Sequence, residues 1–359
     1  MLHAVILAGG SGKRFWPLSR KDRPKQFLKL AGSRTLIQQS YDRLRGLVQP
    51  DFVYVVTNEV LAAGVRDQLG DVPERNVIAE PQPKDTAIAM GLAAGLIQAR
   101  DPEAVLVVSP SDHVIRPGAK FREAIREAVE IASSRGGGVV TFGIPARSPH
   151  TGYGYIRRAG ALEQRGRLRA WSVAAFEEKP DPATAERYVA EGEHYWNSGI
   201  FVWSARTLLD ALSEHLPETR RAIDRIVAAW DGPDRAKVLA GAYEEVAKIS
   251  IDYAVLEKAR DVVALEADFE WSDVGSWAAI PGLYAKDDQG NTVQEAPFAS
   301  VDAKNCLVYG DGRLVAVLGL EDVIVVQTRD ATLVCHRDRA EEVKQLVERL
   351  EGGELEPYT

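Results

Sequence analysis

Cysteine is scarce in this chain of 359 residues, with only Cys306 and Cys335 present, each beside apolar residues. Cysteines so few and so placed predict buried, reduced thiols rather than a disulfide framework. A structural zinc site needs three or four ligands at short spacing, and the cysteines and histidines form no such cluster. The sequence therefore excludes both disulfides and zinc as organising features.

Long hydrophobic runs and an excess of basic residues are also missing. No segment approaches the ~20 apolar residues that span a bilayer, and the N-terminal AVILA run is too short for a signal peptide. The formal net charge is -8, whereas a general nucleic-acid binder needs a basic face. These observations predict a cytoplasmic protein whose partners include neither nucleic acid nor a membrane.

Short apolar runs alternate with amphipathic segments over roughly the first three quarters of the chain. The runs AVILA and AVLVV are continuously apolar, as expected for strands that are covered on both faces. The alternation predicts an α/β layered fold with a mostly parallel sheet. Strands are expected at 3–8, 52–57, 76–80, 104–109, 138–143, 173–177, 198–203 and 262–267, and helices at 35–47, 86–100, 121–133 and 251–260.

The pattern changes near Asp287, where helical segments give way to short strand-like pieces. SVDA, CLVYG, LVAVLG, VIVVQT and TLVCH follow one another between Phe298 and His336, with a turn signal at Gly310-Asp-Gly. An amphipathic helix is expected at about Asp338–Leu350. We therefore predict a large domain at 1–286 and a small β-rich domain with a C-terminal helix at 287–359.

A glycine-rich loop directly follows the first predicted strand. Glycines there let the backbone turn its N–H groups towards a ligand, and Lys13, Arg14 and Lys25 add positive charge. The dinucleotide fingerprint is only half met, because Phe15 stands where the third glycine belongs, and no Walker A motif is present. A tight turn with solvated cations is the alternative, but glycines and cations in one loop favour a cradle for a triphosphate.

Two aspartates follow predicted strands. Asp112 ends the AVLVVSPSD segment, and Asp273 lies in the late segment EWSDVGSW. Open α/β sheets bind ligands at the carboxyl ends of their strands, and magnesium prefers one or two carboxylates together with phosphate oxygens. A turn or a helix cap would explain either aspartate alone, and packing would explain the tryptophans. Together with the glycine loop, the aspartates predict a magnesium site.

Three further segments carry polar groups suited to a phosphorylated sugar. They are TGYGY at 151–155, EEKP at 177–180 and WNSG at 196–199. Carboxylates and an amide suit sugar hydroxyls, and a lysine held by proline suits a phosphate. Ordinary surface charge is the alternative explanation of EEKP, and the spacing alone does not exclude it.

In this order the motifs resemble the sugar-1-phosphate nucleotidyltransferases, and most closely their mannose-1-phosphate guanylyltransferase branch. The resemblance covers nearly the whole chain and rests on LAGGSGKRFWPLSR, PKQFL, EPQPKDTA, PSDHVI, FEEKPD, YWNSGIF, SIDYAVLEK and FEWSDVGSW. It implies an α/β, GT-A-like (Rossmann-like) nucleotide-binding domain with a mixed, mostly parallel sheet, followed by a small C-terminal β-helix-like domain. It also points to a homodimer.

The resemblance implies that GTP and mannose 1-phosphate react, with Mg²⁺, to GDP-mannose and pyrophosphate. Arg14, Lys25 and Asp112 would be catalytic, and Asp112 and Asp273 would hold the metal. Nucleotide binding would fall to Leu7, Gly9, Gly10, Ser11, Gly12, Lys13, Glu80, Thr86 and Asp112. Sugar-phosphate binding would fall to Gly152, Glu178, Lys179, Asn197 and Asp273.

One segment departs from the family pattern. The family pattern is E-P-x-x-R-N-T-A-P-A, whereas this chain has Lys84, Asp85 and Ile88 at the positions of R, N and P. A nucleotidyltransferase that uses another NTP or another sugar phosphate is therefore an alternative. A non-catalytic regulatory subunit on the same fold is a second alternative, although the full set of charged residues argues against it. An NAD-dependent oxidoreductase would rest on the incomplete glycine pattern alone. No isomerase activity of the longer bifunctional members is expected.

Overall fold

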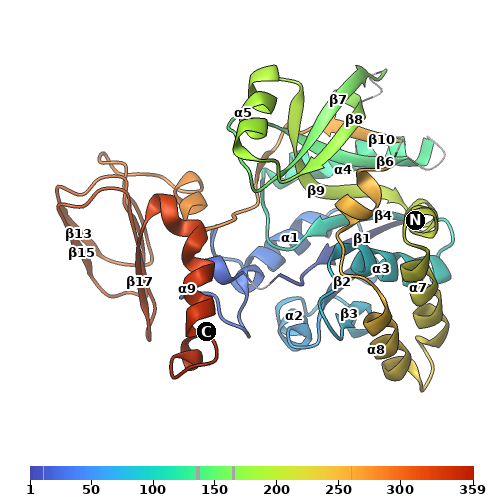
Figure 1. Cartoon of the computed structure of the whole chain (residues 1–359), viewed down its shortest axis with the longest axis horizontal. Coiled ribbons are helices and arrows are strands. Elements are labelled where there is room, and N and C mark those ends of the chain that lie inside the picture. The colour runs from blue at the N-terminus through green and yellow to red at the C-terminus, as the bar shows by residue number, and fades with distance from the viewer. Residues whose placement is uncertain (11, 135–137, 164–165, 260) are drawn as a thin grey trace. The chain divides into compact units, whose positions relative to one another are not determined.

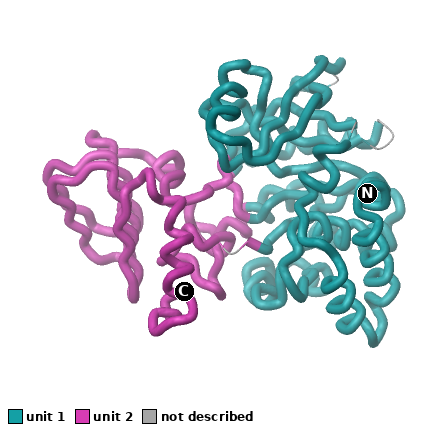
Figure 2. The backbone as a smooth tube through the Cα atoms, viewed as in Figure 1, with its two compact units in different colours: residues 1–9, 40–111, 115–271 teal, residues 10–39, 112–114, 272–359 magenta. Residues whose placement is uncertain are grey.

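The computed structural model describes residues 1–10, 12–134, 138–163, 166–259 and 261–359. The chain forms two compact units, each assembled from separate stretches (Figure 2). Unit 1 contains 1–9, 40–111 and 115–271, and unit 2 contains 10–39, 112–114 and 272–359. The units therefore differ from the predicted domains, because 10–39, 112–114 and 272–286 group with the tail instead of with the large domain.

Unit 1 is built on a nine-stranded mixed sheet (Figure 1). β9 and β8 run against the other strands, so the sheet is mixed, as predicted, and its parallel pairs are β3–β2, β2–β1, β1–β4 and β6–β10. The carboxyl ends of β1 and β4, which are direct neighbours, lead into the glycine loop and the Asp112 segment. In sheet order the strands are β3 (Val77–Glu80), β2 (Val53–Asn58), β1 (Leu2–Leu7), β4 (Val105–Pro110), β9 (His194–Ser204), β6 (Val139–Pro145), β10 (Val262–Glu266), β8 (Ala170–Glu178) and β7 (Gly154–Ala161).

The core of unit 1 lies between this sheet and its helices. α3 (Thr86–Arg100) is apolar all round, and residues 87–97 are buried against α6, α7 and the sheet. The predicted helix at 251–260 is instead a short π-helical segment, Asp252–Leu256, a form that often marks functional sites. The other helices are α1 (Leu36–Leu44), α2 (Ala62–Gln68), α4 (Gly118–Ser134), α5 (Pro182–Glu191), α6 (Ala205–His215), α7 (Pro217–Ala229) and α8 (Arg235–Glu245).

The strands expected in unit 1 are confirmed to within a few residues, and so are the helices at 35–47, 86–100 and 121–133. α2, β7 and α5 to α8 were not predicted. The short strands β5 (Val114–Arg116) and β11 (Glu270–Ser272) lie outside the nine-stranded sheet. Among the described residues, no helix is long and apolar enough to cross a bilayer.

The β-rich part of unit 2 is a coil of stacked parallel strands, which confirms the predicted β-helix-like domain. β12 (Thr292–Gln294), β14 (Leu307–Tyr309) and β16 (Val323–Gln327) stack in one direction, and β13 (Phe298–Val301) pairs in parallel with β15 (Val315–Leu318). β17 (Thr332–His336) closes the coil antiparallel to β16. The interior is filled by small apolar side chains: Ala303, Cys306, Val308, Val315, Val317 and Val325.

The glycine-loop segment and the C-terminal helix share one apolar core in unit 2. α9 (Val343–Leu350) follows a 3-10 turn at Arg337–Glu342, so the predicted tail helix begins later than expected. Phe15 and Trp277 are fully buried, with ring centroids 5.2 Å apart, and the Trp277 indole donates to the Trp16 carbonyl at 3.0 Å. This packing explains why 10–39 group with the tail, and it confirms the packing interpretation for Trp277.

Candidate active site

Gly12 holds the glycine loop in close contact with Lys25. Its φ of 61° lies in the left-handed region, and a Cβ there would lie 2.3 Å from the Cβ of Lys25. A side chain at Gly9 or Gly10 would meet nothing within 4 Å. Their backbone is thus open to a ligand, as a phosphate cradle requires. Ser11 was predicted in the same cradle and lies outside the described residues.

Lys25 joins the two predicted metal-binding segments. Its ammonium lies 2.8 Å from Oδ2 of Asp112 and also donates to the backbone carbonyl of Asp273. Lys25 is 7% exposed. Burial raises the pKa of Asp112, but the attraction of Lys25 and of His113 outweighs it and leaves the pKa below its ordinary value. Asp112 is therefore an ionised oxygen donor at neutral pH.

The backbone at Asp273 is strained. The next residue, Val274, is fully buried and has a φ of 48°, a value that a β-branched residue rarely adopts. Its N–H donates to the Ser272 hydroxyl at 3.1 Å. Strain of this kind persists where surrounding structure enforces it and is concentrated at functional sites.

The predicted phosphate and metal residues line one pocket of about 340 Å³ in unit 2. Asp112 and Asp273 line it together with cationic side chains, and hard oxygen donors beside phosphate-binding groups are the donor set that magnesium prefers. The residues that match the prediction are Gly12, Lys13, Arg14, Lys25, Asp112 and Asp273. The structure thus brings together residues that are spread over some 260 positions of the chain.

The tail supplies acidic partners to the loop cations. Lys13 lies 2.7 Å from Glu351, and Arg14 lies 2.8 Å from Glu341. Arg14 is about half exposed, and its partner is more so. Exposed ion pairs of this kind contribute little to stability. A phosphate can therefore replace the carboxylate as the partner of Arg14.

Of the predicted sugar-phosphate residues, Asp273 belongs to unit 2, and the others form a second group in unit 1. Glu178 and Lys179 lie at the end of β8, where their side chains form an ion pair. Lys179 has a φ of 51°, and its N–H donates to the Tyr153 carbonyl at 3.2 Å. Gly152 lies just before β7, and its N–H donates to the His150 ring at 3.1 Å.

Asn197 leads to a residue that the sequence interpretation missed. Its amide donates to the carboxylate of Asp252 at 3.0 Å. Burial raises the pKa of Asp252 to about 7, and the negative charge of Glu178 adds to the rise. The signal was present in the sequence as one carboxylate within the otherwise largely apolar stretch IDYAVL at 251–256.

Aromatic side chains surround the same segments of unit 1. The Tyr153 ring stacks on His150 at 3.8 Å and meets the edges of Trp196 and Trp271 at 5.2 Å each. Aromatic faces beside carboxylate and amide groups are suited to a sugar ring with its hydroxyls. These aromatic residues were not predicted as site residues.

The remaining predicted nucleotide-binding residues have partners inside unit 1. Glu80 is buried and accepts from the Tyr243 hydroxyl at 2.9 Å, and burial raises the pKa of Glu80 to about 7. The Thr86 hydroxyl accepts from the Ile251 N–H at 2.9 Å, and the Leu7 carbonyl accepts from Ser111. These bonds position the ends of β1 and β3 and the start of α3. A role in nucleotide binding stays a prediction for all three residues.

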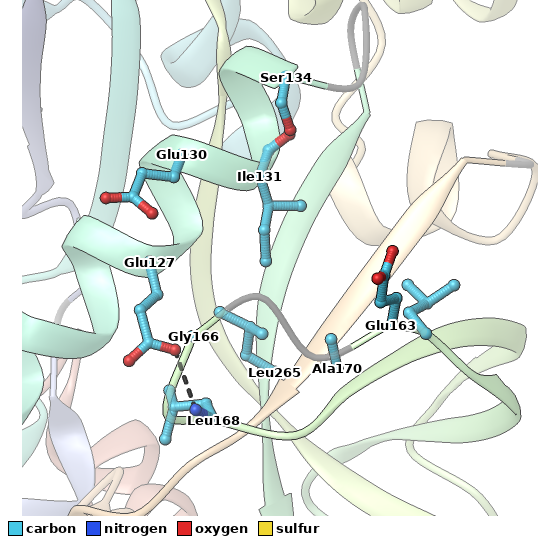
Figure 3. Close-up of a pocket in the computed structure, with 10 residues that line it drawn as sticks. Glu127, Glu130, Ile131, Ser134, Glu163, Gly166, Leu168, Ala170 and Leu265 are labelled. Carbon is cyan, nitrogen blue, oxygen red and sulfur yellow. Dashed lines mark hydrogen bonds between the residues drawn. The ribbon is translucent and has the colours of Figure 1, made fainter.

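A separate cavity of about 250 Å³ in unit 1 does not suit a triphosphate (Figure 3). Glu127, Glu130 and Glu163 line it, and none of its described lining residues is basic. Glu127 accepts a hydrogen bond from the N–H of Leu168 at 2.9 Å, and this bond holds the backbone at Leu168, which also lines the cavity. Anionic phosphates would be repelled by this lining.

Two family models match the chain, and together they cover most of it. Nucleotidyl transferase matches residues 3–289, and the MannoseP isomerase/GMP-like beta-helix domain matches residues 298–350. The second match covers β13 to β17 and α9.

Relatives of this chain include a guanylyltransferase and a polysaccharide biosynthesis protein. A mannose-1-phosphate guanylyltransferase from Klebsiella pneumoniae is 39% identical over 361 residues, which cover 100% of this chain and 76% of that protein. The alginate biosynthesis protein AlgA from Pseudomonas aeruginosa is 41% identical, with 97% of this chain and 72% of that protein covered.

A solved structure agrees in fold along almost the whole chain. The crystal structure of a protein from Thermus thermophilus, described as a mannose-1-phosphate geranyltransferase, has a TM-score of 0.87 and 34% identity, covering 98% of this chain and 99% of that one. With the family match over 3–289 and relatives near 40% identity, the chain belongs to the nucleotidyl transferase family.

Proposed function

We propose that this chain transfers a guanylyl group from GTP to mannose 1-phosphate, giving GDP-mannose and pyrophosphate. The observation that carries the proposal is the junction of Lys25 with the Asp112 carboxylate and the Asp273 backbone, in a pocket that Lys13 and Arg14 also line. The names of the relatives support the choice of guanosine and mannose.

In the proposed reaction a phosphate oxygen of mannose 1-phosphate forms a bond to the α-phosphorus of GTP, and the bond to the bridging oxygen of pyrophosphate breaks. No covalent enzyme intermediate and no protein base are required, because the attacking phosphate already carries a negative charge. The protein contributes positioning and positive charge for the developing negative charge. Lys13, Arg14 and Lys25 supply that charge, with the open backbone of Gly9 and Gly10.

Asp112 and Asp273 would hold Mg²⁺, and their oxygens suit this ion. When bound, the metal neutralises phosphate charge and helps to orient the α-phosphate. Lys25 keeps Asp112 ionised and in place for this role. In unit 1, Glu178, Asn197 and Gly152 would bind the sugar hydroxyls, and Lys179 would bind its phosphate.

The test is pyrophosphate release from purified protein with magnesium, for each of the four common NTPs against mannose and glucose 1-phosphates. We expect turnover with GTP and mannose 1-phosphate and its loss with EDTA. Turnover with a different pair only would correct the substrates, and no turnover with any pair would refute the proposal in favour of a regulatory subunit.

The same proposal includes a homodimer through the β-rich coil. Val301 and Leu318 are directly paired in β13 and β15, and they are 59% and 73% exposed. Exposed aliphatic side chains that lie side by side add to an apolar surface that a second subunit can cover. Leu318→Glu should convert a dimer to a monomer in light scattering, whereas Leu355→Glu, at an exposed residue outside the coil, should not. A cytoplasmic location stays a prediction from the sequence.

A further inference from the structure

Lys344 of α9 lines the same pocket as the predicted phosphate and metal residues. Residues 298–336 contain no glycine-rich phosphate loop and no paired carboxylates at strand ends, so the sequence of the tail predicted no part in the chemistry. Yet every other described residue that lines this pocket comes from the glycine-loop, Asp112 and Asp273 segments. The tail thus adds one cation to a pocket that Lys13, Arg14 and Lys25 already line.

The position of Lys344 is determined by the helix that carries it. Val343 and Val347, one helical turn apart, are 3% and 4% exposed and pack in the apolar core that also contains Phe15 and Trp16. Lys344 follows Val343 directly, so its backbone is held at the border between this core and the pocket. The side chain itself is 57% exposed and can extend towards a ligand.

The ion pairs around the pocket leave the ammonium of Lys344 able to bind an anionic ligand. Lys13 and Arg14 are engaged by Glu351 and Glu341 at 2.7 and 2.8 Å. The ion pair of Lys344 is with Glu348 on its own helix at 3.7 Å, longer than a hydrogen bond. A triphosphate offers stronger acceptors than an exposed carboxylate at that distance.

We infer that Lys344 is a further phosphate-binding residue for the nucleotide, supplied by the C-terminal helix. The inference rests on the proposed function, since the pocket is assigned to GTP there. In this inference α9 is part of the nucleotide site. The β-rich coil, proposed above as the dimer contact, would also hold this cation in place. Lys344 would contribute to GTP binding and not to mannose 1-phosphate binding.

The experiment compares Lys344→Met with the wild type in steady-state kinetics, with GTP and mannose 1-phosphate varied separately. A lost charge-assisted contact to phosphate should raise KM for GTP about tenfold and leave KM for mannose 1-phosphate within about twofold. Lys344→Arg should restore most of the lost affinity. Equilibrium titration with magnesium and GTP, without the sugar phosphate, should show the same loss of affinity.

Two control variants separate phosphate binding from helix stability. Glu348→Gln removes the ion pair but keeps Lys344, and Arg349→Met removes the same charge from α9 at a residue outside the pocket. Neither should raise KM for GTP. If Lys344→Met matches these controls while the wild type is active, the inference is wrong and the proposed function stands. A wild type without turnover would instead refute the proposed function, and unchanged GTP titration by Lys344→Met would then refute the inference as well.

Discussion

The ammonium of Lys25 lies 2.8 Å from the Asp112 carboxylate and donates to the backbone carbonyl of Asp273. One buried side chain therefore connects Asp112 with Asp273, two residues of unit 2 that lie far apart in the sequence. The contact keeps a carboxylate ionised in a poorly solvated place, because Lys25 compensates the cost of its burial. Lys25 and Asp112 thus form a fixed charged pair beside the cations of the glycine loop.

Lys25→Met should reduce turnover by at least about 100-fold, because a positioned charge at the reacting phosphate is lost. The variant also leaves Asp112 without its partner, which lowers the free energy of unfolding. The double variant Lys25→Met/Asp112→Asn removes both charges, so it should regain stability in thermal melts without regaining activity. Lys29→Met, at an exposed lysine close by, is the control. Recovery of turnover in the double variant would show that Lys25 acts only on the fold.

Asp112→Ala and Asp273→Ala should each remove nearly all turnover, since each takes an oxygen ligand from magnesium. The measurement is initial rate against magnesium concentration, with Asp288→Ala, at an exposed aspartate, as the control. A normal rate and magnesium dependence in Asp273→Ala would reduce the metal site to Asp112 alone.

Glu341→Gln should strengthen GTP binding, because it frees Arg14 from its partner. The gain corresponds to one exposed ion pair, so KM for GTP should fall about two- to fivefold at low salt. At roughly 1 M salt the difference should disappear, since charges are screened over about 3 Å. Glu342→Gln, whose carboxylate pairs with Arg339 instead, should leave KM unchanged. An equal effect of both variants would show that Arg14 is not held back by Glu341.

Stability should fall as pH rises from about 5 to about 8, and Asp252 should account for part of the fall. Its pKa in the folded chain is about 7, above the ordinary 3.8. The folded state therefore binds more protons than the unfolded state between these values, and stability decreases as the pH rises through them. Asp252→Asn should flatten the decrease in melting temperature, and Glu80→Gln should remove a further part, because the pKa of Glu80 is also raised to about 7.

The control for the pH effect is Asp288→Asn, at an exposed aspartate. It should follow the wild-type curve. A wild-type melting temperature that stays level or rises over the same pH range, with Asp252→Asn indistinguishable from it, would contradict the raised pKa of Asp252.

Much of the fold could be predicted from local pattern. The buried strands of unit 1 are continuous apolar runs such as AVILA and AVLVV, and a run of that kind has few other ways to avoid water. The loop glycines and the cations of the pocket were likewise visible, because phosphate chemistry limits the residue types that can serve. The helical segment at 252–256 was misjudged, since π-helical turns have no pattern of their own.

The sequence by itself determined the fold class, the β-rich tail and most charged residues of the candidate site, since periodicity and residue chemistry are local properties. Only the tertiary structure decided which distant residues share a core. It placed the glycine-loop segment with the tail through Phe15 and Trp277, and it brought Lys344 to the pocket. It also brought Asp252 to Asn197. Burial and proximity depend on packing between segments far apart in the chain, and no local pattern records them.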